Sequence, residues 1–183
     1  MMMTEIRIIL IATLLIRKPV IYLSKLQQRD YYYGAALSLF FSRNADSKPS
    51  LIESSDKACI YRMSTDTSHD FFIYMKYTSK EISSAKDERV WQFSLTETDK
   101  KKITDCINSN LRTYILLICG SNKLNAGEIA VLTDDEFKTI SYKTGIRIKL
   151  QGKNPKKFTV IDRYSGDDLL IDRNRLNSKI TDI

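Results

Sequence analysis

The sequence predicts a single domain of the α/β (α+β) class, built on a mixed sheet. Residues 70–78 alternate in the manner of a strand, residues 112–119 are continuously apolar after the first two positions, and residues 25–42 repeat apolar side chains at helical steps. The 183 residues, 43% of them hydrophobic, suffice for one sizeable core. Without a repeat or linker, we expect a domain over 24–183 after an apolar extension over 1–23.

The N-terminal extension contains the apolar run 6–16, which only Arg7 and Thr13 interrupt. It falls short of the roughly 20 residues that a membrane span requires. It also lacks the basic start and small-residue cleavage site of a signal peptide. We therefore predict no stable membrane span.

The first helix is expected over 25–42, opened by the capping-box pattern Ser24-x-x-Gln27. A loop over 44–50 should follow it, because that segment is rich in turn residues. Three strands come next, and polar segments connect them. Consecutive antiparallel pairing is the simplest arrangement for these strands, which are 57–63, 70–78 and 89–95.

A second helix is expected over 97–109, with Ile103, Cys106 and Ile107 on its apolar face. The apolar run after it suits a central strand covered on both sides. Three further elements complete this part of the chain: the strand 112–119, the strand 127–132, and a short helix to about 142 that the capping box Thr133-x-x-Glu136 opens.

Positive charge gathers near the C-terminus. The formal charge of the whole chain is +7, while residues 143–179 hold ten basic residues and four acids, a difference of +6. Residues 145–151 and 157–162 flank a turn and predict a basic hairpin. We predict a nucleic-acid-binding surface there, because lysine and arginine can follow phosphates; the residues are Arg147, Lys149, Lys153, Lys156 and Lys157. A solubilising edge hairpin is the alternative.

Three cysteines and a single histidine limit the chemistry. Cys59, Cys106 and Cys119 lie far apart in apolar contexts, which favours buried reduced thiols and a reducing, cytoplasmic location. No CxxC occurs, and His69 sits in a polar turn. Zinc fingers, histidine-metal nucleases and Ser-His-Asp triads are therefore excluded.

The segment Asp70 to Tyr77 is the most informative one. A lone Lys76 in an aromatic strand costs free energy unless an anion receives it. Because side chains alternate along a strand, Asp70, Phe72, Tyr74 and Lys76 share one face. This polar face favours a site. The alternative is an exposed face on which Lys76 extends to solvent beside the tyrosines.

The order helix, three antiparallel strands, helix, strand over about 25–132 resembles the αβββαβ core of the PD-(D/E)xK, or restriction-endonuclease-like, nucleases. The segments around Lys76, Trp91-x-Phe93 and Leu116 to Gly120 also look like those of a group of uncharacterised bacterial proteins.

In the nucleases, two acids hold Mg²⁺ and a lysine orients or polarises the attacking water. The resemblance makes Lys76 the motif lysine and Asp70 or Asp66 the first acid, with Glu53 upstream. Tyr74 stands where the second acid belongs.

Taken together, the sequence predicts a protein that engages DNA or RNA through a nuclease-like core. Asp70 and Lys76 are the candidate catalytic residues of a Mg²⁺-dependent nuclease, and Asp70, Glu53 and Asp66 are the candidate metal ligands. A degenerate nuclease fold that only binds is the other interpretation of these residues. The alternative is a non-enzymatic module with a protein partner, as an accessory of a bacterial defence or mobile-element system, which rests on fold-level analogy.

Overall fold

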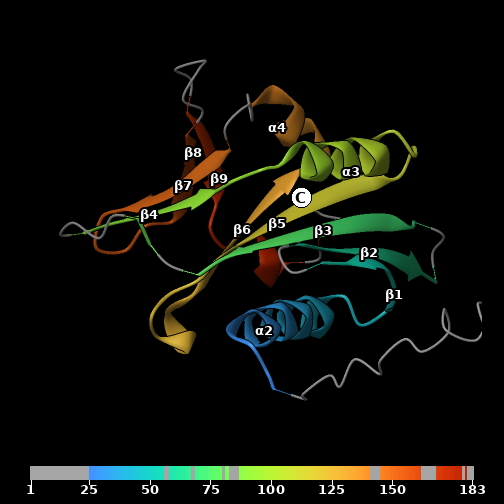
Figure 1. Ribbon diagram of the computed structural model, residues 1–183, viewed down its shortest axis with the longest axis horizontal. Helices are drawn as coiled ribbons and strands as arrows, with labels where there is room; N and C mark the ends of the chain where they lie inside the picture. Colours follow the sequence, from blue (N-terminus) through green and yellow to red (C-terminus); the bar gives the residue numbers. More distant parts are fainter. Residues whose placement is uncertain are drawn as a thin grey trace, which may run out of the picture.

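A computed structural model describes residues 25–55, 58–66, 69–79, 81–82, 87–140, 145–161, 168–178 and 180. The apolar extension over 1–23 lies outside these residues. The described part combines two sheets with three α-helices, α2 (Gln28–Arg43), α3 (Glu97–Ile107) and α4 (Asp134–Thr139), and two short 3₁₀ helices, η1 (Leu124–Ala126) and η2 (Arg175–Asn177) (Figure 1). The predicted mixed α/β class is confirmed.

The first sheet has five strands in the order β1-β2-β3-β5-β6. Their bounds are β1 Ser47–Ser54, β2 Ala58–Thr65, β3 Phe71–Thr78, β5 Arg112–Cys119 and β6 Glu128–Thr133. Strands β1, β2 and β3 form an antiparallel meander, β5 runs parallel to β3, and β6 runs antiparallel to β5. Helix α3 lies on the crossover between β3 and β5, as a parallel connection requires.

The second sheet is antiparallel throughout, in the order β4-β7-β8-β9. Its strands are β4 Glu88–Phe93, β7 Ile146–Gln151, β8 Lys157–Ile161 and β9 Leu169–Asp172. The predicted basic hairpin is confirmed here, because β7 and β8 pair directly and Arg147 faces Ile161.

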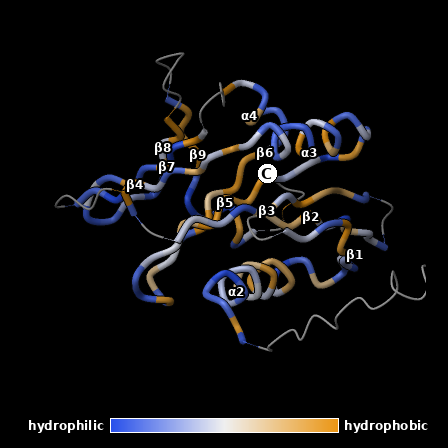
Figure 2. Tube along the Cα trace, in the orientation of Figure 1, coloured by the Kyte–Doolittle hydropathy of each residue, from blue (hydrophilic) through white to orange (hydrophobic). Residues whose placement is uncertain are grey.

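The five-stranded sheet has a hydrophobic cluster on each face. Helix α2 covers one face, while α3, α4 and the second sheet lie on the other (Figure 1). Strand β5 supplies both clusters by alternation: Leu116 packs toward α2, and Leu117 packs toward the second sheet. Its near-continuous apolar colour reflects this double burial (Figure 2), as expected of a strand covered on both sides.

The first predicted helix exists but starts later than expected. Helix α2 begins at Gln28, and its capping box joins Gln27 to Asp30, with the Gln27 N–H donating to Asp30 Oδ2 at 2.7 Å. The box predicted from Ser24 is therefore wrong, because the Asp30 carboxylate caps the first turn. The box between Thr133 and Glu136 is confirmed at α4.

The predicted pairing of 89–95 with 70–78 is wrong. Strand β3 has β2 on one side and β5 on the other, so no free edge remains for β4. Instead β4 pairs with β7, and Trp91 faces Ile148. The third antiparallel strand of the first sheet is β1, in the segment predicted as a loop. It is an edge strand whose exposed, Pro49-containing sequence is tolerated because one side makes no ladder hydrogen bonds.

Two further expectations concern the environment of the chain. Cys59, Cys106 and Cys119 are buried and free, as predicted. Across the described ranges, we find no helix with the length and apolar character that a membrane crossing demands.

Candidate functional site

Lys76 is buried in the middle of the molecule. Its neighbours on the adjacent strands are Ala58 of β2 and Leu117 of β5. Only 5% of its side chain is exposed, and its Nζ lies 2.8 Å from Asp99 Oδ2. The alternative of a solvent-exposed lysine is therefore wrong: an anion within the chain receives the ammonium group.

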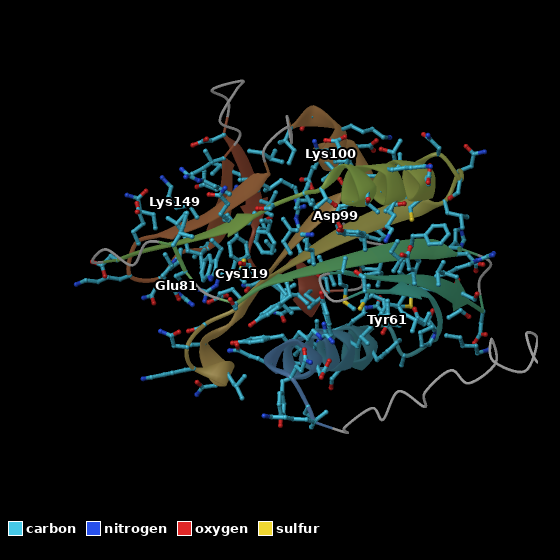
Figure 3. All side chains as sticks on the ribbon, viewed as in Figure 1. Tyr61, Glu81, Asp99, Lys100, Cys119 and Lys149 are labelled. Atoms are coloured by element: carbon cyan, nitrogen blue, oxygen red, sulfur yellow. The ribbon has the colours of Figure 1, made fainter. Side chains whose placement is uncertain are left out.

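Asp99 reaches Lys76 from helix α3. It is the third residue of the helix, and Thr96 is the N-cap. Its carboxylate faces the five-stranded sheet from the start of α3 (Figure 3). Oδ2 accepts hydrogen bonds from the Thr96 N–H and hydroxyl at 2.8 Å each, and Oδ1 accepts one from the Tyr74 hydroxyl at 2.8 Å. The shared face predicted for Tyr74 and Lys76 is confirmed.

The electrostatics of this cluster, formed by Tyr74, Lys76, Thr96 and Asp99, favour a charged pair. Burial alone would raise the pKa of Asp99, but the hydrogen bonds from Lys76, Thr96 and Tyr74 outweigh it and lower the pKa to about 2. Burial and the neighbouring carboxylate raise the pKa of Tyr74 far above its ordinary value. At neutral pH the cluster therefore contains a carboxylate, and Tyr74 serves as a neutral hydrogen-bond donor.

The acids predicted from the sequence lie elsewhere. Asp70 precedes β3 at the end away from Lys76, about 20 Å along the strand at about 3.3 Å per residue. Its Oδ2 accepts from Arg62 at 2.8 Å and its Oδ1 from the Thr65 N–H at 3.3 Å. The Arg62 hydrogen bond lowers the pKa of Asp70. The expected site shared by Asp70 and Lys76 is not formed.

The other two candidate ligands also pair separately. Asp66 lies 2.7 Å from Lys48, and Glu53 pairs with Lys102 of α3. Glu53 stands opposite Ile60, far along β2 from the turn that holds Asp66. The structure therefore leaves the three predicted ligands apart, because each one binds a different cation.

The Mg²⁺ ion that the resemblance implies does not fit these residues. Within the ranges that the structure describes, no three Asp, Glu, His or Cys side chains form a metal-binding group. The carboxylate nearest to Lys76 is Asp99, and both its oxygens already accept hydrogen bonds. Tyr74 supplies a neutral phenol where a second acid would be needed.

The five predicted nucleic-acid-binding residues do not share one surface. Arg147 and Lys149 of β7 lie on the face opposite to the buried Ile146, Ile148 and Leu150. Lys157 of β8 shares their side, because Lys149 pairs with Thr159 two residues further along. We call this side of the second sheet the outer face. Arg147 donates to Gln92 Oε1 at 3.3 Å, and no carboxylate in the described residues forms an ion pair with any of these three cations.

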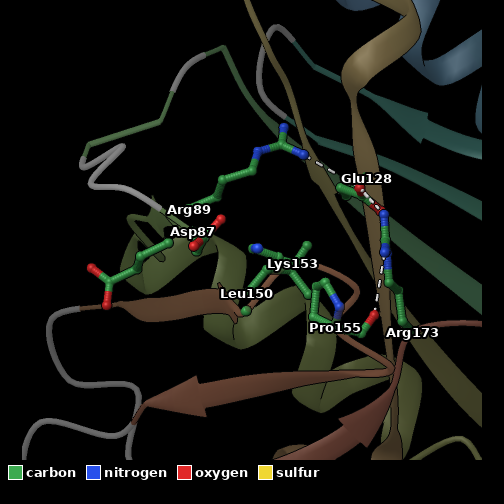
Figure 4. A pocket seen from close by; sticks show the side chains of 9 residues that line it. Asp87, Arg89, Glu128, Leu150, Lys153, Pro155 and Arg173 are labelled. Atoms are coloured by element: carbon green, nitrogen blue, oxygen red, sulfur yellow. Dashed lines mark hydrogen bonds and ion pairs between the residues drawn. The ribbon is translucent and has the colours of Figure 1, made fainter.

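Lys153 belongs to a different surface. It lines a pocket of about 280 Å³ at the end of the second sheet, together with Arg89, Glu128 and Arg173. Glu128 binds both arginines, and Arg173 also donates to the Pro155 carbonyl at 3.2 Å (Figure 4). Lys156 is exposed at the turn between β7 and β8. Arg89 also pairs with Glu81 at 2.8 Å, so two arginines and two glutamates form an ion network that links the two sheets.

Asp99 is the residue that the sequence analysis missed. A signal for its position existed, since Thr96-x-x-Asp99 has the form of a capping box before an apolar helix face. Its contact with Lys76, 23 residues earlier in the chain, depends on where α3 crosses the sheet. Comparisons with protein-family models, with curated proteins and with solved structures gave no significant match.

Proposed function

We propose that the protein binds nucleic acid through the outer face of its second sheet, without metal-dependent cleavage at β3. One observation carries this proposal: Arg147, Lys149 and Lys157 lie on one face with no ion-pair partner among the described residues. Cations held side by side without partners can release counterions from a phosphate backbone. The clustering of net positive charge over 143–179 supports the same surface.

The arrangement of the first sheet supports a nuclease-like core used for binding. When β4, which follows β3 in the chain and belongs to the second sheet, is set aside, the elements α2, β1, β2, β3, α3 and β5 have the order helix, three antiparallel strands, helix, strand. Lys76, which the resemblance makes the motif lysine, lies on β3 of that meander. Since Asp99 and Tyr74 occupy its surroundings, we propose a degenerate site in which an internal ion pair stands in place of a metal centre.

The test is binding measured by fluorescence anisotropy with labelled short nucleic acids, both single-stranded and duplex. Affinity should be measurable at 50 mM salt and should fall steeply by 200 mM. Replacing Arg147, Lys149 and Lys157 with alanine should flatten the salt slope by about 0.7 to 0.9 per lost phosphate contact. The matched control replaces the exposed Lys25, Lys101 and Lys123, which removes the same charge elsewhere. Absence of binding at low salt would refute the proposal.

A second candidate function is a protein-interaction module. A groove of about 390 Å³ lies between α2, η1 and η2, and the half-exposed Leu39 and Leu124 line it. Exposed leucines around a groove are typical of contact surfaces. A photoreactive residue at either leucine should then capture a partner in cells, while one at Lys101 should not. Lack of capture at both leucines would exclude this groove.

A further inference from the structure

We propose that the outer face takes double-helical nucleic acid by its phosphate backbone and does not read sequence. This inference rests on the proposed function and specifies its ligand. The ligand chemistry is a duplex phosphodiester backbone, which DNA and RNA both offer. Three properties of the face lead to this conclusion: its width, the residue types on it, and the places of its charges.

The face is too wide to enter a groove. Strands β4, β7, β8 and β9 lie side by side, and three interstrand spacings of about 4.8 Å make about 14 Å between the outer strand axes. The major groove of B-DNA is about 12 Å wide and admits a two-stranded ribbon at most. A four-stranded face must therefore lie across the backbone, where it contacts phosphates rather than base edges.

The strands present no aromatic ring on this face. Its outward residues, read from the pairing register, are Glu88, Val90, Gln92, Arg147, Lys149, Gln151, Lys157, Thr159, Ile161, Leu170 and Asp172. The aromatic residues of the same strands, Trp91, Phe93 and Phe158, point into the core. Trp91 is fully buried, and its Nε1 donates to the Gly120 carbonyl at 2.7 Å.

This distribution disfavours single strands. Proteins that hold single-stranded nucleic acid stack successive bases on aromatic side chains, and this stacking supplies much of their affinity. Apart from the aliphatic Val90, Ile161 and Leu170, the strands of the outer face offer charge and hydrogen-bonding groups. These groups suit phosphate and sugar contacts, which position a duplex and carry no sequence information.

The charges are spaced for neighbouring phosphates. Arg147 and Lys149 are two residues apart on β7, which places them about 6.6 Å apart along the strand. Lys157 lies on the adjacent strand, and the polar Gln92 and Thr159 flank the cations. A duplex carries one charge per about 1.7 Å of axis, so it supplies several phosphates to such a patch at once.

The experiment compares four probes of equal length with the full chain: a single strand, its DNA duplex, a DNA duplex of unrelated sequence, and an RNA duplex. We expect both DNA duplexes to bind equally, within about twofold, and more tightly than the single strand. With three cations engaged, log affinity should fall with log salt at a slope up to about 2.7 for a duplex. Binding of the DNA duplexes, of the RNA duplex or of both supports the inference and shows which kind of duplex backbone the face accepts.

The single tryptophan gives a second readout. Because Trp91 is buried on the inner side, its fluorescence should stay unchanged on saturation with duplex. The variant Arg147→Ala/Lys149→Ala/Lys157→Ala should lose the duplex preference, while the Lys25, Lys101 and Lys123 control keeps it. Tighter binding of the single strand, or strong discrimination between the two DNA sequences, would overturn this inference and leave the proposed function standing. No binding of any probe would overturn both.

Discussion

The buried Lys76 and the cations of the outer face are opposite uses of positive charge in one chain. Lys76 is 5% exposed and binds an aspartate whose two oxygens both accept hydrogen bonds. Arg147 and Lys149, which are half-buried, and the exposed Lys157 lie on the outer face without ion pairs in the described part. The cation within an apolar run therefore forms a buried internal pair, whereas the cations on the solvent side of a half-buried strand form no ion pair within the described residues.

The difference follows from the cost of desolvation. A charge taken out of water must be paired and hydrogen-bonded. The packing of α3 on β3 buries Lys76, so its ammonium group requires the Asp99 carboxylate. Charges on a surface are stable without a protein partner, since water solvates them. The first group is therefore expected to control stability, and the second is expected to control binding.

Replacing Lys76 with methionine should give the largest effect. Methionine keeps the aliphatic stem but removes the charge, which leaves the Asp99 carboxylate buried without its cation. Breaking a buried pair in this way costs about 3–5 kcal/mol in the free energy of unfolding. Urea unfolding measures this value, and nucleic-acid binding at a temperature where the variant is folded should be unchanged.

Lys102→Met is the matched control for this prediction. Lys102 pairs with Glu53 at the surface, where an ion pair contributes about 0–1 kcal/mol. If Lys76→Met were as mild as Lys102→Met, the buried pair would not stabilise the fold. If Lys76→Met abolished binding while the protein remained folded, the division between the two groups of cations would be wrong.

The next effect is the acid sensitivity of Asp99. Its pKa is lowered to about 2 in the folded protein, from an ordinary value of 3.8. The carboxylate therefore contributes stability above about pH 4, and this contribution is lost as the pH falls toward 2. At 1.36 kcal/mol per unit, the contribution is about 2 kcal/mol. Urea unfolding at several pH values should show that, below pH 4, the free energy of unfolding falls less steeply with decreasing pH in Asp99→Asn than in the parent. Equal slopes for both proteins would contradict this assignment.

The fold was predictable wherever local pattern and tertiary context agree. Residues 112–119 were predicted as a central strand because their apolar run suits no exposed position, and β5 is that strand. The edge strand β1 was not predictable in the same way. Both its faces are exposed, so Lys48, Pro49 and Ser50 have the composition of a loop. The partner of β4 was also hidden, since pairing depends on which strand edges other strands already occupy.

The site was predictable only in part. The sequence indicated that Lys76 requires an anion, and that Tyr74 shares its face. It could not identify Asp99, because a capping pattern at Thr96 explains that aspartate without any partner on β3. The strand face that Asp70 shares with Lys76 predicts a common site, but the two residues are about 20 Å apart along the strand, so a shared face does not imply contact.

A smaller effect should follow from the acids at the margins of the outer face. Glu88 lies opposite Gln151, and Asp172 lies opposite Lys157. Both carboxylates repel phosphate, so Glu88→Gln with Asp172→Asn should raise affinity for duplex by about twofold to fivefold, the range of a surface ion pair. Anisotropy at 50 mM salt measures this gain. As a control, Asp105→Asn on α3 should leave affinity unchanged; a loss of affinity in the double variant would place the duplex elsewhere.

The smallest effect is expected for Asp70→Asn, and it separates the two interpretations of β3 most directly. A metal-dependent nuclease would need the charge of Asp70, so the variant would lose a Mg²⁺-dependent rise in melting temperature. In the structure, Asp70 binds Arg62 at the far end of β3 from Lys76, and its pKa is lowered by that hydrogen bond. We therefore expect that Mg²⁺ leaves the melting temperature of the parent unchanged and likewise that of the variant. The two proteins should also bind duplex with equal affinity. A Mg²⁺-induced shift that Asp70→Asn abolishes would mean that Asp70 holds a metal, and the outer face would then no longer account for the function alone.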